Sequence, residues 1–269
     1  MKFDLSGKVA VITGGGGVLC SAIAEGLAVE GVRCVLLDIV EDRAREALER
    51  VKRAGSDGLA LKASVLDRGD LERAAEDTLQ AFGRVDFLIN GAGGNHPKAT
   101  TSKEAPFFDL PEDAVRFVFD LNFMGTFLAS QVFGRVMAER KEGVILNIAS
   151  MNAIRPLTRI PAYSAAKAAV ANFTQWLAVH MAQEYSPNIR VVSIAPGFFL
   201  TEQNRFLLLD ERGELTERGK QIIAHTPMGR FGAPEDLIGA VVWLLSPAAS
   251  FVTGVVIPID GGFSAYSGV

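Results

Sequence analysis

Short apolar runs alternate along the chain with longer segments whose apolar positions recur at a helical period. Several of the short runs are continuous in Val, Ile and Leu, which is typical of strands buried on both faces of a parallel sheet. The predicted strands are residues 9–13, 34–38, 58–62, 85–90, 144–149, 189–194 and 255–259.

The amphipathic segments between these runs predict helices over residues 19–30, 42–53, 68–82, 111–139, 162–184 and 234–245. Pro111 and Pro234 stand at first-turn positions, where proline is well tolerated. The alternation predicts an α/β fold, a doubly wound, Rossmann-type parallel sheet of about seven strands with helices on both faces. No repeat or linker divides the chain, so we expect residues 1–269 to form a single domain.

Two longer segments, 93–110 and 196–227, fit neither pattern. Both follow predicted strands, and ligands bind at the carboxyl ends of the strands in open α/β folds. Long segments of this kind inside one domain are commonly functional loops. We therefore predict a substrate lid, partly helical, around residues 197–227.

Composition narrows the choice of function. A net charge of −4 and a pI near 5.5 disfavour a nucleic-acid partner. No apolar run approaches the roughly 18 residues that cross a bilayer, and no signal-peptide pattern precedes the first strand. Cys20 and Cys34 have neither metal-ligand spacing nor a disulfide framework, so we expect two buried thiols in a cytoplasmic protein without a metal site.

A nucleotide site is predicted where the first strand ends in Thr13 and the four glycines 14–17 lead into a helix. Such a turn lets the backbone approach a pyrophosphate at the helix N-terminus. Asp38 ends the second strand, where a carboxylate can accept hydrogen bonds from both adenosine ribose hydroxyls and would repel a 2′-phosphate. This favours NAD over NADP; the alternative is a flexible turn followed by a solvated charge.

Tyr163 and Lys167 are four residues apart in a predicted helix and would share one face. An ammonium beside a phenol favours the phenolate, which makes a usable base near neutral pH. Ser150, at the end of the fifth predicted strand, could hold a substrate oxygen. The alternatives are a tyrosine packed on the core and a serine that caps a turn.

Seven motifs in chain order resemble the short-chain dehydrogenase/reductase family over essentially the full length. They are the Thr-Gly-rich turn, Asn90-Gly91-Ala92-Gly93, Asn122, Ser150, Tyr163-x-x-x-Lys167, Pro196-Gly197 and Asp260-Gly261-Gly262. The resemblance implies a catalytic tetrad of Asn122, Ser150, Tyr163 and Lys167, in which Asn122 holds a water that passes protons to solvent. It implies cofactor contacts from Gly14, Gly17, Leu19, Asp38, Val65, Asn90, Ala92, Tyr163, Lys167, Phe199 and Thr201.

Three positions depart from the family pattern. Val18 and Cys20 replace the last two glycines of the turn, and the Cys20 side chain is expected to push the first helix slightly away from the sheet. Ser64 replaces an aspartate that often contacts adenine, which leaves adenine recognition weaker or dependent on backbone groups. Gly91 replaces the second asparagine of the usual Asn-Asn-Ala-Gly.

Candidate substrate residues are His96, Asn152 and Arg155, with Arg159 nearby in sequence. Arginines and amides suit a polyhydroxylated substrate that carries a carboxylate. The alternatives are structural ion pairs or a neighbouring subunit for the arginines, and an ordinary loop residue for His96.

The segments 91–97, 150–153 and 196–205 resemble bacterial D-mannonate oxidoreductases, which implies hydride transfer between NAD(H) and D-fructuronate or D-mannonate. Another keto-sugar-acid reductase, such as a gluconate dehydrogenase, is the runner-up. A non-catalytic NAD-sensing protein is the alternative of a different class.

Helices 111–139 and 162–184 carry apolar residues on more than one face, which favours a second packing partner. These residues are Val115, Phe119, Phe123 and Phe127 in the first helix and Ala169, Phe173, Trp176 and Leu177 in the second. The family resemblance implies a homotetramer.

Overall fold

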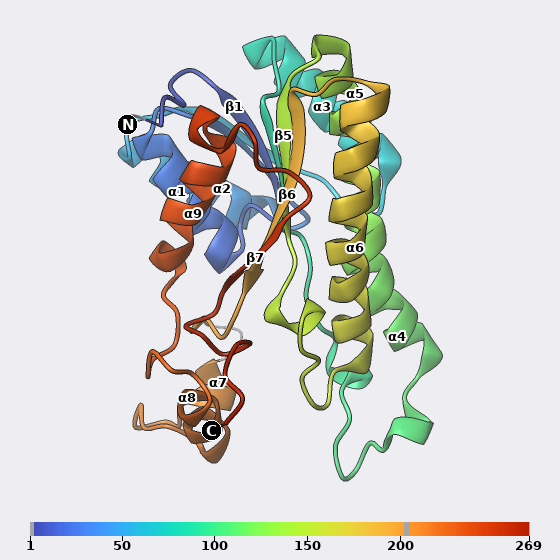
Figure 1. Ribbon diagram of the computed structural model, residues 1–269, viewed down its shortest axis with the longest axis vertical. Helices are drawn as coiled ribbons and strands as arrows, with labels where there is room; N and C mark the ends of the chain where they lie inside the picture. The colour runs from blue at the N-terminus through green and yellow to red at the C-terminus, as the bar shows by residue number, and fades with distance from the viewer. Residues whose placement is uncertain (1–2, 202–204, 269) are drawn as a thin grey trace.

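The computed structural model describes residues 3–201 and 205–268. Within these residues seven parallel strands form one sheet in the order β3-β2-β1-β4-β5-β6-β7 (Figure 1). The strands are β1 (Val9–Thr13), β2 (Arg33–Asp38), β3 (Gly58–Lys62), β4 (Phe87–Asn90), β5 (Gly143–Ile148), β6 (Ile189–Pro196) and β7 (Val256–Ile259). The strand order reverses between β1 and β4, and such a switch point opens a crevice at the carboxyl ends of the strands. The predicted doubly wound fold is confirmed.

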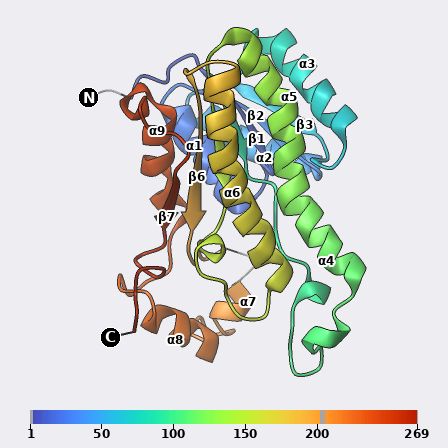
Figure 2. The same cartoon turned by 45° about the vertical axis from the view of Figure 1, so that its right-hand side comes forward.

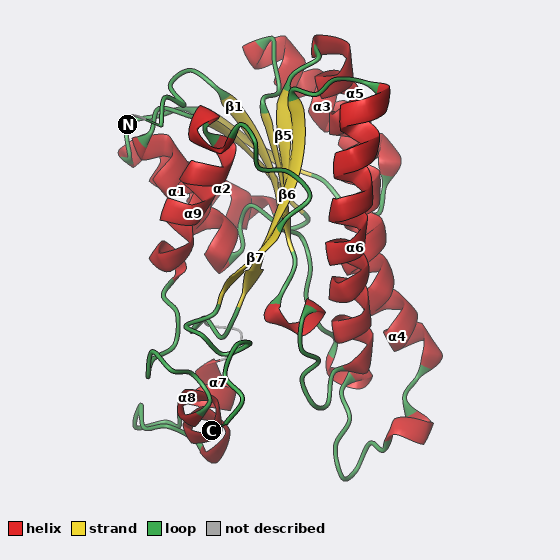
Figure 3. Ribbon diagram, viewed as in Figure 1, coloured by secondary structure: helices red, strands yellow, loops and turns green. Residues whose placement is uncertain are grey.

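Helices cover both faces of the sheet (Figures 1 and 3). One face carries α1 (Val18–Val29), α2 (Glu41–Arg53) and α9 (Ile238–Leu245), and the other carries α3 (Arg68–Phe82), α5 (Gly125–Arg140) and α6 (Pro161–Glu184). Each face has its own apolar core, one around Ile12, Ile23 and Leu36 and one around Leu88 and Phe133. Both cores exclude water from the sheet and so fix the positions of the strand ends.

The predicted helix over 111–139 is divided in the structure. α4 (Glu112–Phe119) runs into a π-helical turn, Asp120–Met124, before α5 begins at Gly125. A π turn inserts an extra residue and is often found at functional sites. Here it contains Asn122, whose side chain is fully buried. The helical spacing of apolar residues in the sequence identifies the whole helical segment. It does not show where one extra residue is inserted into a helical turn.

The segment predicted as a lid contains two short helices, α7 (Arg205–Leu208) and α8 (Glu217–Ala224). Figure 2 places them at the same end of the molecule as the loop after β5 and the start of α6. The Thr216 hydroxyl caps α8 by accepting a hydrogen bond from the Gly219 N–H at 3.0 Å. Residues 202–204 of this segment lie outside the described residues. No helix in the described part of the chain is long and apolar enough to cross a membrane.

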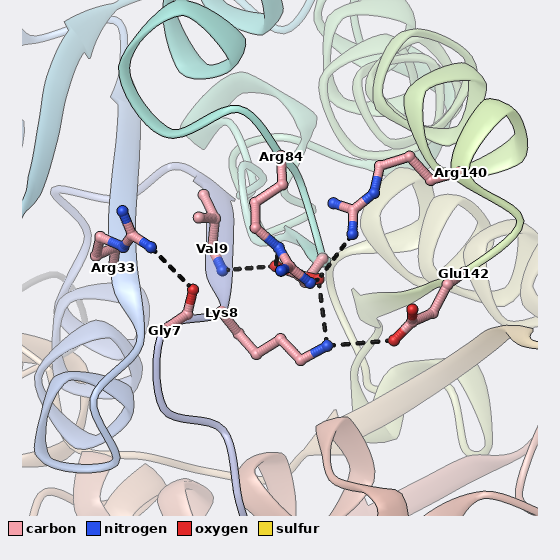
Figure 4. Close-up of polar contacts among 8 residues, drawn as sticks. Gly7, Lys8, Val9, Arg33, Arg84, Arg140 and Glu142 are labelled. Carbon is pink, nitrogen blue, oxygen red and sulfur yellow. Dashed lines mark hydrogen bonds and ion pairs between the residues drawn. The ribbon is translucent and has the colours of Figure 1, made fainter.

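At the opposite edge of the sheet, a buried Asp86 accepts bonds from several elements. The backbone N–H of Val9 donates to it at 2.9 Å, and Arg84 donates from both its Nε and Nη2. Lys8 and Arg140 converge on the same place (Figure 4) and complete the ion pairs. Burial alone would raise the pKa of Asp86, but these hydrogen bonds and charges together lower it. The carboxylate therefore fastens β1, β4 and α5 together.

Candidate active site

A cavity of about 520 Å³ lies at the carboxyl edge of the sheet and joins the glycine turn to three of the four predicted catalytic residues, Ser150, Tyr163 and Lys167; Asn122 does not line it. It is lined by every predicted cofactor residue except Asn90: Gly14, Gly17, Leu19, Asp38, Val65, Ala92, Tyr163, Lys167, Phe199 and Thr201. Ser150 lines the same cavity. Residues from strands β1, β2, β4, β5 and β6 meet here because parallel strands end at one edge of a sheet.

The glycine turn is shaped by close backbone packing. Gly14 adopts a left-handed φ of 64°, and a Cβ there would lie 2.8 Å from the Cα of Ala92. A Cβ on Gly16 would lie 2.5 Å from the Cβ of Arg43 in α2. Gly17 precedes α1 and has no side chain that could cap the helix with a hydrogen bond. The first N–H groups of α1 are therefore available to a pyrophosphate, and its dipole favours the negative charge.

Asp38 ends β2 at the wall of the cavity, as predicted. One of its carboxylate oxygens accepts a hydrogen bond from the Gly16 N–H at 3.0 Å, and the other accepts one from the Val40 N–H at 3.0 Å. Each oxygen keeps a lone pair for a further donor. The two bonds orient the carboxylate, so a bound ribose would meet a fixed acceptor.

Ser150, Tyr163 and Lys167 meet at the other end of the cavity. A hydrogen bond links Ser150 to Tyr163, and the Lys167 Nζ lies 5.7 Å from the centre of the Tyr163 ring. The Lys167 ammonium donates to the carbonyl of Ile148 at 2.7 Å. The helical spacing and the strand end thus bring these three side chains together as expected.

Burial and hydrogen bonding both act on the ionisation of Tyr163 and Lys167. Burial raises the pKa of Tyr163, and its hydrogen bond with Ser150 opposes that rise. Burial lowers the pKa of Lys167 to about 8. The hydrogen bond with Ser150 thus favours the phenolate, and activation of Tyr163 by Lys167 stays a prediction.

Asn122 joins the π turn to the loop after β4. Its Nδ2 donates to the carbonyls of Gly94 and Val118, both at 2.7 Å, and its Oδ1 accepts from the Gly94 N–H at 3.1 Å. Both amide hydrogens are thus used, so any water held by Asn122 would bind its oxygens. In this geometry the side chain clamps the loop; its role in a proton relay stays a prediction.

Asn90 does not line the cavity. It is buried at the end of β4, where its Nδ2 donates to Ser130 at 3.0 Å and to Asn147 at 2.8 Å, and Asn147 in turn donates to Thr174 at 2.9 Å. The Asn90 Oδ1 has no partner among the described residues. This network connects β4 and β5 to α5 and α6. It therefore stabilises the carboxyl ends of these two strands, next to the cavity.

Among the predicted substrate residues, Asn152 is the most enclosed. Its Nδ2 donates to the Ser150 Oγ at 3.3 Å, and its Oδ1 accepts from Ser164 and from the Leu157 N–H, both at 3.0 Å. Asn152 thus orients Ser150 within its loop. Arg155 is exposed in the same loop. The His96 ring packs against Phe117, with its Nδ1 accepting from the Lys98 N–H at 3.1 Å.

Gly93 was not among the predicted site residues, although it belongs to a motif that was recognised. A Cβ there would lie 2.6 Å from the Asn122 Oδ1 and 3.2 Å from the Lys167 Nζ. A side chain at position 93 would therefore displace the Asn122 amide or the Lys167 ammonium, and glycine leaves both in place. No group of three or more His, Cys, Asp or Glu side chains that could hold a metal ion occurs in the described residues.

Comparison with known proteins agrees with this architecture. The family model described as enoyl-(acyl carrier protein) reductase matches residues 18–264. The uncharacterized oxidoreductase UxuB of Bacillus subtilis (strain 168) is 51% identical, over 99% of this chain and 98% of its own. 5-Keto-D-gluconate 5-reductase of Escherichia coli (strain K12) is 34% identical, over 97% of this chain and 96% of its own.

A crystal structure of a proposed D-mannonate oxidoreductase from Haemophilus influenzae, with bound NAD, is 45% identical and superimposes with a TM-score of 0.93, covering 99% of this chain and 98% of that one. These matches extend over nearly the whole length of both partners. The chain therefore belongs to the short-chain dehydrogenase/reductase family of oxidoreductases.

Proposed function

We propose that this protein uses NADH to reduce the ketone of D-fructuronate to the secondary alcohol of D-mannonate, or catalyses the reverse oxidation. One observation carries the proposal: a single cavity joins Asp38 and the N-terminus of α1 to Ser150, Tyr163 and Lys167. A dinucleotide lying along this cavity would have its adenosine ribose at Asp38 and its reactive ring beside Tyr163.

The choice of NAD is supported by the Asp38 carboxylate, which would repel a 2′-phosphate. It is also supported by the NAD bound to the Haemophilus relative. In the reductive direction, bound NADH supplies the hydride that the ketone carbon accepts. The remaining chemistry belongs to the residues of this chain.

Ser150 would hold the ketone oxygen through its hydroxyl, which Asn152 orients from behind. Tyr163 would donate a proton to that oxygen, so that the C=O group becomes CH–OH. Lys167 would bind the nicotinamide ribose and carry a positive charge beside the phenol. The Ile148 carbonyl fixes the position of Lys167 by accepting its hydrogen bond.

The sugar-acid substrate is supported by two relatives. One acts, by its name, on 5-keto-D-gluconate, and the other is a proposed D-mannonate oxidoreductase. Both names describe ketone or alcohol groups on six-carbon acids. We also propose that segment 197–227 serves as the substrate lid, since α7 and α8 lie at the same end of the molecule as the loop after β5, which contains Ser150.

The testing experiment is NADH oxidation with D-fructuronate, with NADPH and 5-keto-D-gluconate run in parallel. We expect turnover with NADH that falls roughly 10²- to 10⁴-fold in Tyr163→Phe, since one general acid is removed. Tyr266→Phe is the matched control, because Tyr266 is 38% exposed and lines neither the active-site cavity nor the groove between α5 and α6. NADH binding, followed by its fluorescence, should persist in both variants.

The outcomes separate the alternatives. Turnover with 5-keto-D-gluconate in place of D-fructuronate would indicate a gluconate dehydrogenase. NADH binding without turnover of any keto-sugar acid would contradict the proposed function and favour a NAD-sensing protein.

We also propose a cytoplasmic homotetramer whose subunits pair through α5 and α6. A groove of about 550 Å³ runs between these helices, and an aromatic row of Phe127, Phe173, Trp176 and His180 follows it. Trp176 is 57% exposed, which is unfavourable for a large apolar ring in water. Light scattering should give a tetramer for the native chain and a smaller species for Trp176→Glu.

A further inference from the structure

The chain forms a tight turn directly after β7, at residues 260–264, which we call the C-terminal turn. One carboxylate oxygen of Asp260 accepts a hydrogen bond from the Gly262 N–H at 2.9 Å, and the other accepts one from the Ser264 N–H at 2.8 Å. Gly261 and Gly262 have left-handed φ values of 63° and 88°, which glycine adopts without strain. The side chain of Asp260 therefore fixes the shape of the C-terminal turn.

The C-terminal turn packs against the end of the lid, where the chain leaves α8. Figures 1 and 2 both show the end of the chain beside this helix. The Met228 N–H donates to the Gly261 carbonyl at 3.1 Å. A Cβ on Gly261 would lie 2.9 Å from the Thr226 Cγ2, and one on Gly262 would lie 3.1 Å from the Pro227 Cγ. The two segments are therefore in direct contact.

Phe263, in the C-terminal turn, connects this contact to the active-site cavity. Its ring meets the Phe198 ring nearly edge to face, with the ring centres 5.2 Å apart. It also meets the imidazole ring of His225, the residue that follows α8, with the ring centres 6.4 Å apart. Aromatic rings at these separations attract each other. Phe198 in turn lines the same cavity as Ser150 and Tyr163.

Phe198 also lines a second cavity, of about 380 Å³, between the C-terminal turn and the residues that follow α8. The other walls of this cavity include Thr226 and Met228. The backbone of Phe198 is held where its carbonyl accepts from the Gly232 N–H at 2.9 Å. Its ring has fewer contacts, because an open volume supplies no atoms to pack against it. The ring of Phe263 is therefore an important support for the ring of Phe198.

We propose that Phe263 is a positioning residue of the active site, which supports Phe198 at the cavity wall and holds the lid in place through His225. The last residues of the chain then complete the site, although none of residues 260–264 lines its cavity. This gives the Asp-Gly-Gly motif a role, because it forms the turn that carries Phe263. The inference rests on the proposed lid but not on the identity of the sugar acid.

The first test measures how readily the lid opens. Arg212 is exposed in the turn between α7 and α8, where trypsin can cleave the chain. Cleavage of a folded protein follows the population of the locally opened form. In Phe263→Ala we expect cleavage after Arg212 to be roughly two- to ten-fold faster, because two aromatic contacts are lost. The masses of the fragments identify the site. Cleavage after Arg53, which is exposed outside the lid, should keep its native rate.

Phe251→Ala is the matched control, since it makes the same change at a fully exposed ring, and its lid should be cleaved at the native rate. Phe263→Tyr keeps the ring and should restore slow cleavage. His225→Ala removes the partner on the lid. If the two rings act together, the double variant of Phe263 and His225 should be cleaved more slowly than the product of the two single effects.

The second test concerns the wall of the cavity that Phe198 forms. In Phe263→Ala we expect KM for D-fructuronate to rise roughly two- to ten-fold, because the Phe198 ring loses its support. The change in kcat should be smaller, since Ser150, Tyr163 and Lys167 lie on other elements. Phe263→Tyr should recover the native KM, and Phe251→Ala should not alter it.

Two results would overturn the inference. Cleavage after Arg212 that is no faster in Phe263→Ala than in Phe251→Ala would show that Phe263 does not hold the lid, whatever the substrate is. An unchanged KM in Phe263→Ala, when the native enzyme reduces D-fructuronate, would show that Phe263 does not position the cavity wall, and the proposed function would stand. A native protein that does not reduce D-fructuronate contradicts the proposed function, and the cleavage test still decides the role of Phe263.

Discussion

The thiol of Cys20 occupies the space that a side chain on Gly91 would need. A Cβ on Gly91 would lie 2.1 Å from the Cys20 Sγ and 2.9 Å from the Thr13 carbonyl. Both residues depart from the pattern of the family, and the structure shows that the two departures compensate each other. The added side chain on α1 enters the gap left by the missing side chain after β4, and burial raises the pKa of the Cys20 thiol to about 12.

This relationship predicts a coupled pair of substitutions. Gly91→Ala should destabilise the protein by about 1–3 kcal/mol, because the new methyl group overlaps the Cys20 sulfur. With Cys20→Ala in the same chain the loss should be smaller than the sum of the two single losses, by about 1 kcal/mol. Urea unfolding of the four proteins measures the coupling. Gly239→Ala is the control, since nothing lies within 4 Å of a Cβ there; additive effects would show that the two sites are independent.

Lys167 should reduce the stability of the fold at neutral pH. Its pKa is lowered from 10.5 to about 8, because burial disfavours the ammonium. The loss of folding stability caused by burying the ammonium is complete below pH 8. It disappears as the pH rises towards the pKa of lysine in the unfolded chain, so the native protein gains stability between these two pH values. Lys167→Met should therefore be more stable than the native protein at pH 7 and lose this advantage near pH 10, while turnover is abolished.

Denaturant unfolding at pH 7 and pH 10 measures the difference between the Lys167→Met and native proteins. Lys62→Met provides the comparison, because Lys62 is exposed at the end of β3. A Lys167→Met protein that is no more stable at pH 7 would mean that its hydrogen bond to Ile148 offsets the burial cost.

Asp86 should dominate the stability of the edge of the sheet opposite the active site. Asp86→Asn leaves Arg84 and Lys8 without their shared carboxylate and should lower the free energy of unfolding by about 3 kcal/mol. Because the pKa of Asp86 is lowered in the folded protein, its contribution is present above the usual value of 3.8 and is lost as the pH falls below it. Thermal unfolding between pH 3 and pH 7 should therefore show a smaller pH dependence in Asp86→Asn.

Glu142→Gln is the control for this edge. Glu142 pairs with Lys8 at 3.2 Å, but its side chain is more than half exposed. The substitution should therefore lower the free energy of unfolding by less than about 1 kcal/mol. An equal decrease in the free energy of unfolding in Asp86→Asn and Glu142→Gln would contradict a special role for the buried carboxylate.

Asp38 should determine the choice between NADH and NADPH. Asp38→Asn keeps the size of the side chain but removes the charge that would repel a 2′-phosphate, so the preference for NADH should fall by roughly a hundred-fold. Fluorescence titration with each dinucleotide measures it. Asp42→Asn, an exposed change in α2, should leave both affinities unchanged. An unaltered ratio in Asp38→Asn would place the selectivity elsewhere in the cavity.

Much of the architecture follows from local patterns. Runs of Val, Ile and Leu determine the strands, because a central parallel strand is buried on both faces. Parallel strands then deliver their carboxyl ends to one edge, so Asp38, Ser150 and the glycine turn meet without further information. The spacing of Tyr163 and Lys167 is likewise sufficient, because a helix places such residues on one face.

Contacts between distant segments are not encoded in such patterns. A family motif in the sequence identified Asn122 as a candidate catalytic residue. It did not indicate that a π turn would bury the side chain, or that its amide group would donate hydrogen bonds to the carbonyls of Gly94 and Val118. The packing of β4 against β5 places the Asn90 side chain in the core beside Asn147, and a contact between Asn90 and the cofactor stays a prediction.

The sequence by itself therefore determined the doubly wound parallel sheet and the place of the candidate site at the carboxyl ends of its strands, because both depend on short-range periods and strand ends. Only the tertiary structure decided which neighbour each side chain meets. The pairing of Cys20 with Gly91 and the burial that lowers the pKa of Lys167 both depend on segments far apart in the chain. Their distances are set by the packing of whole helices on the sheet, which no local pattern specifies.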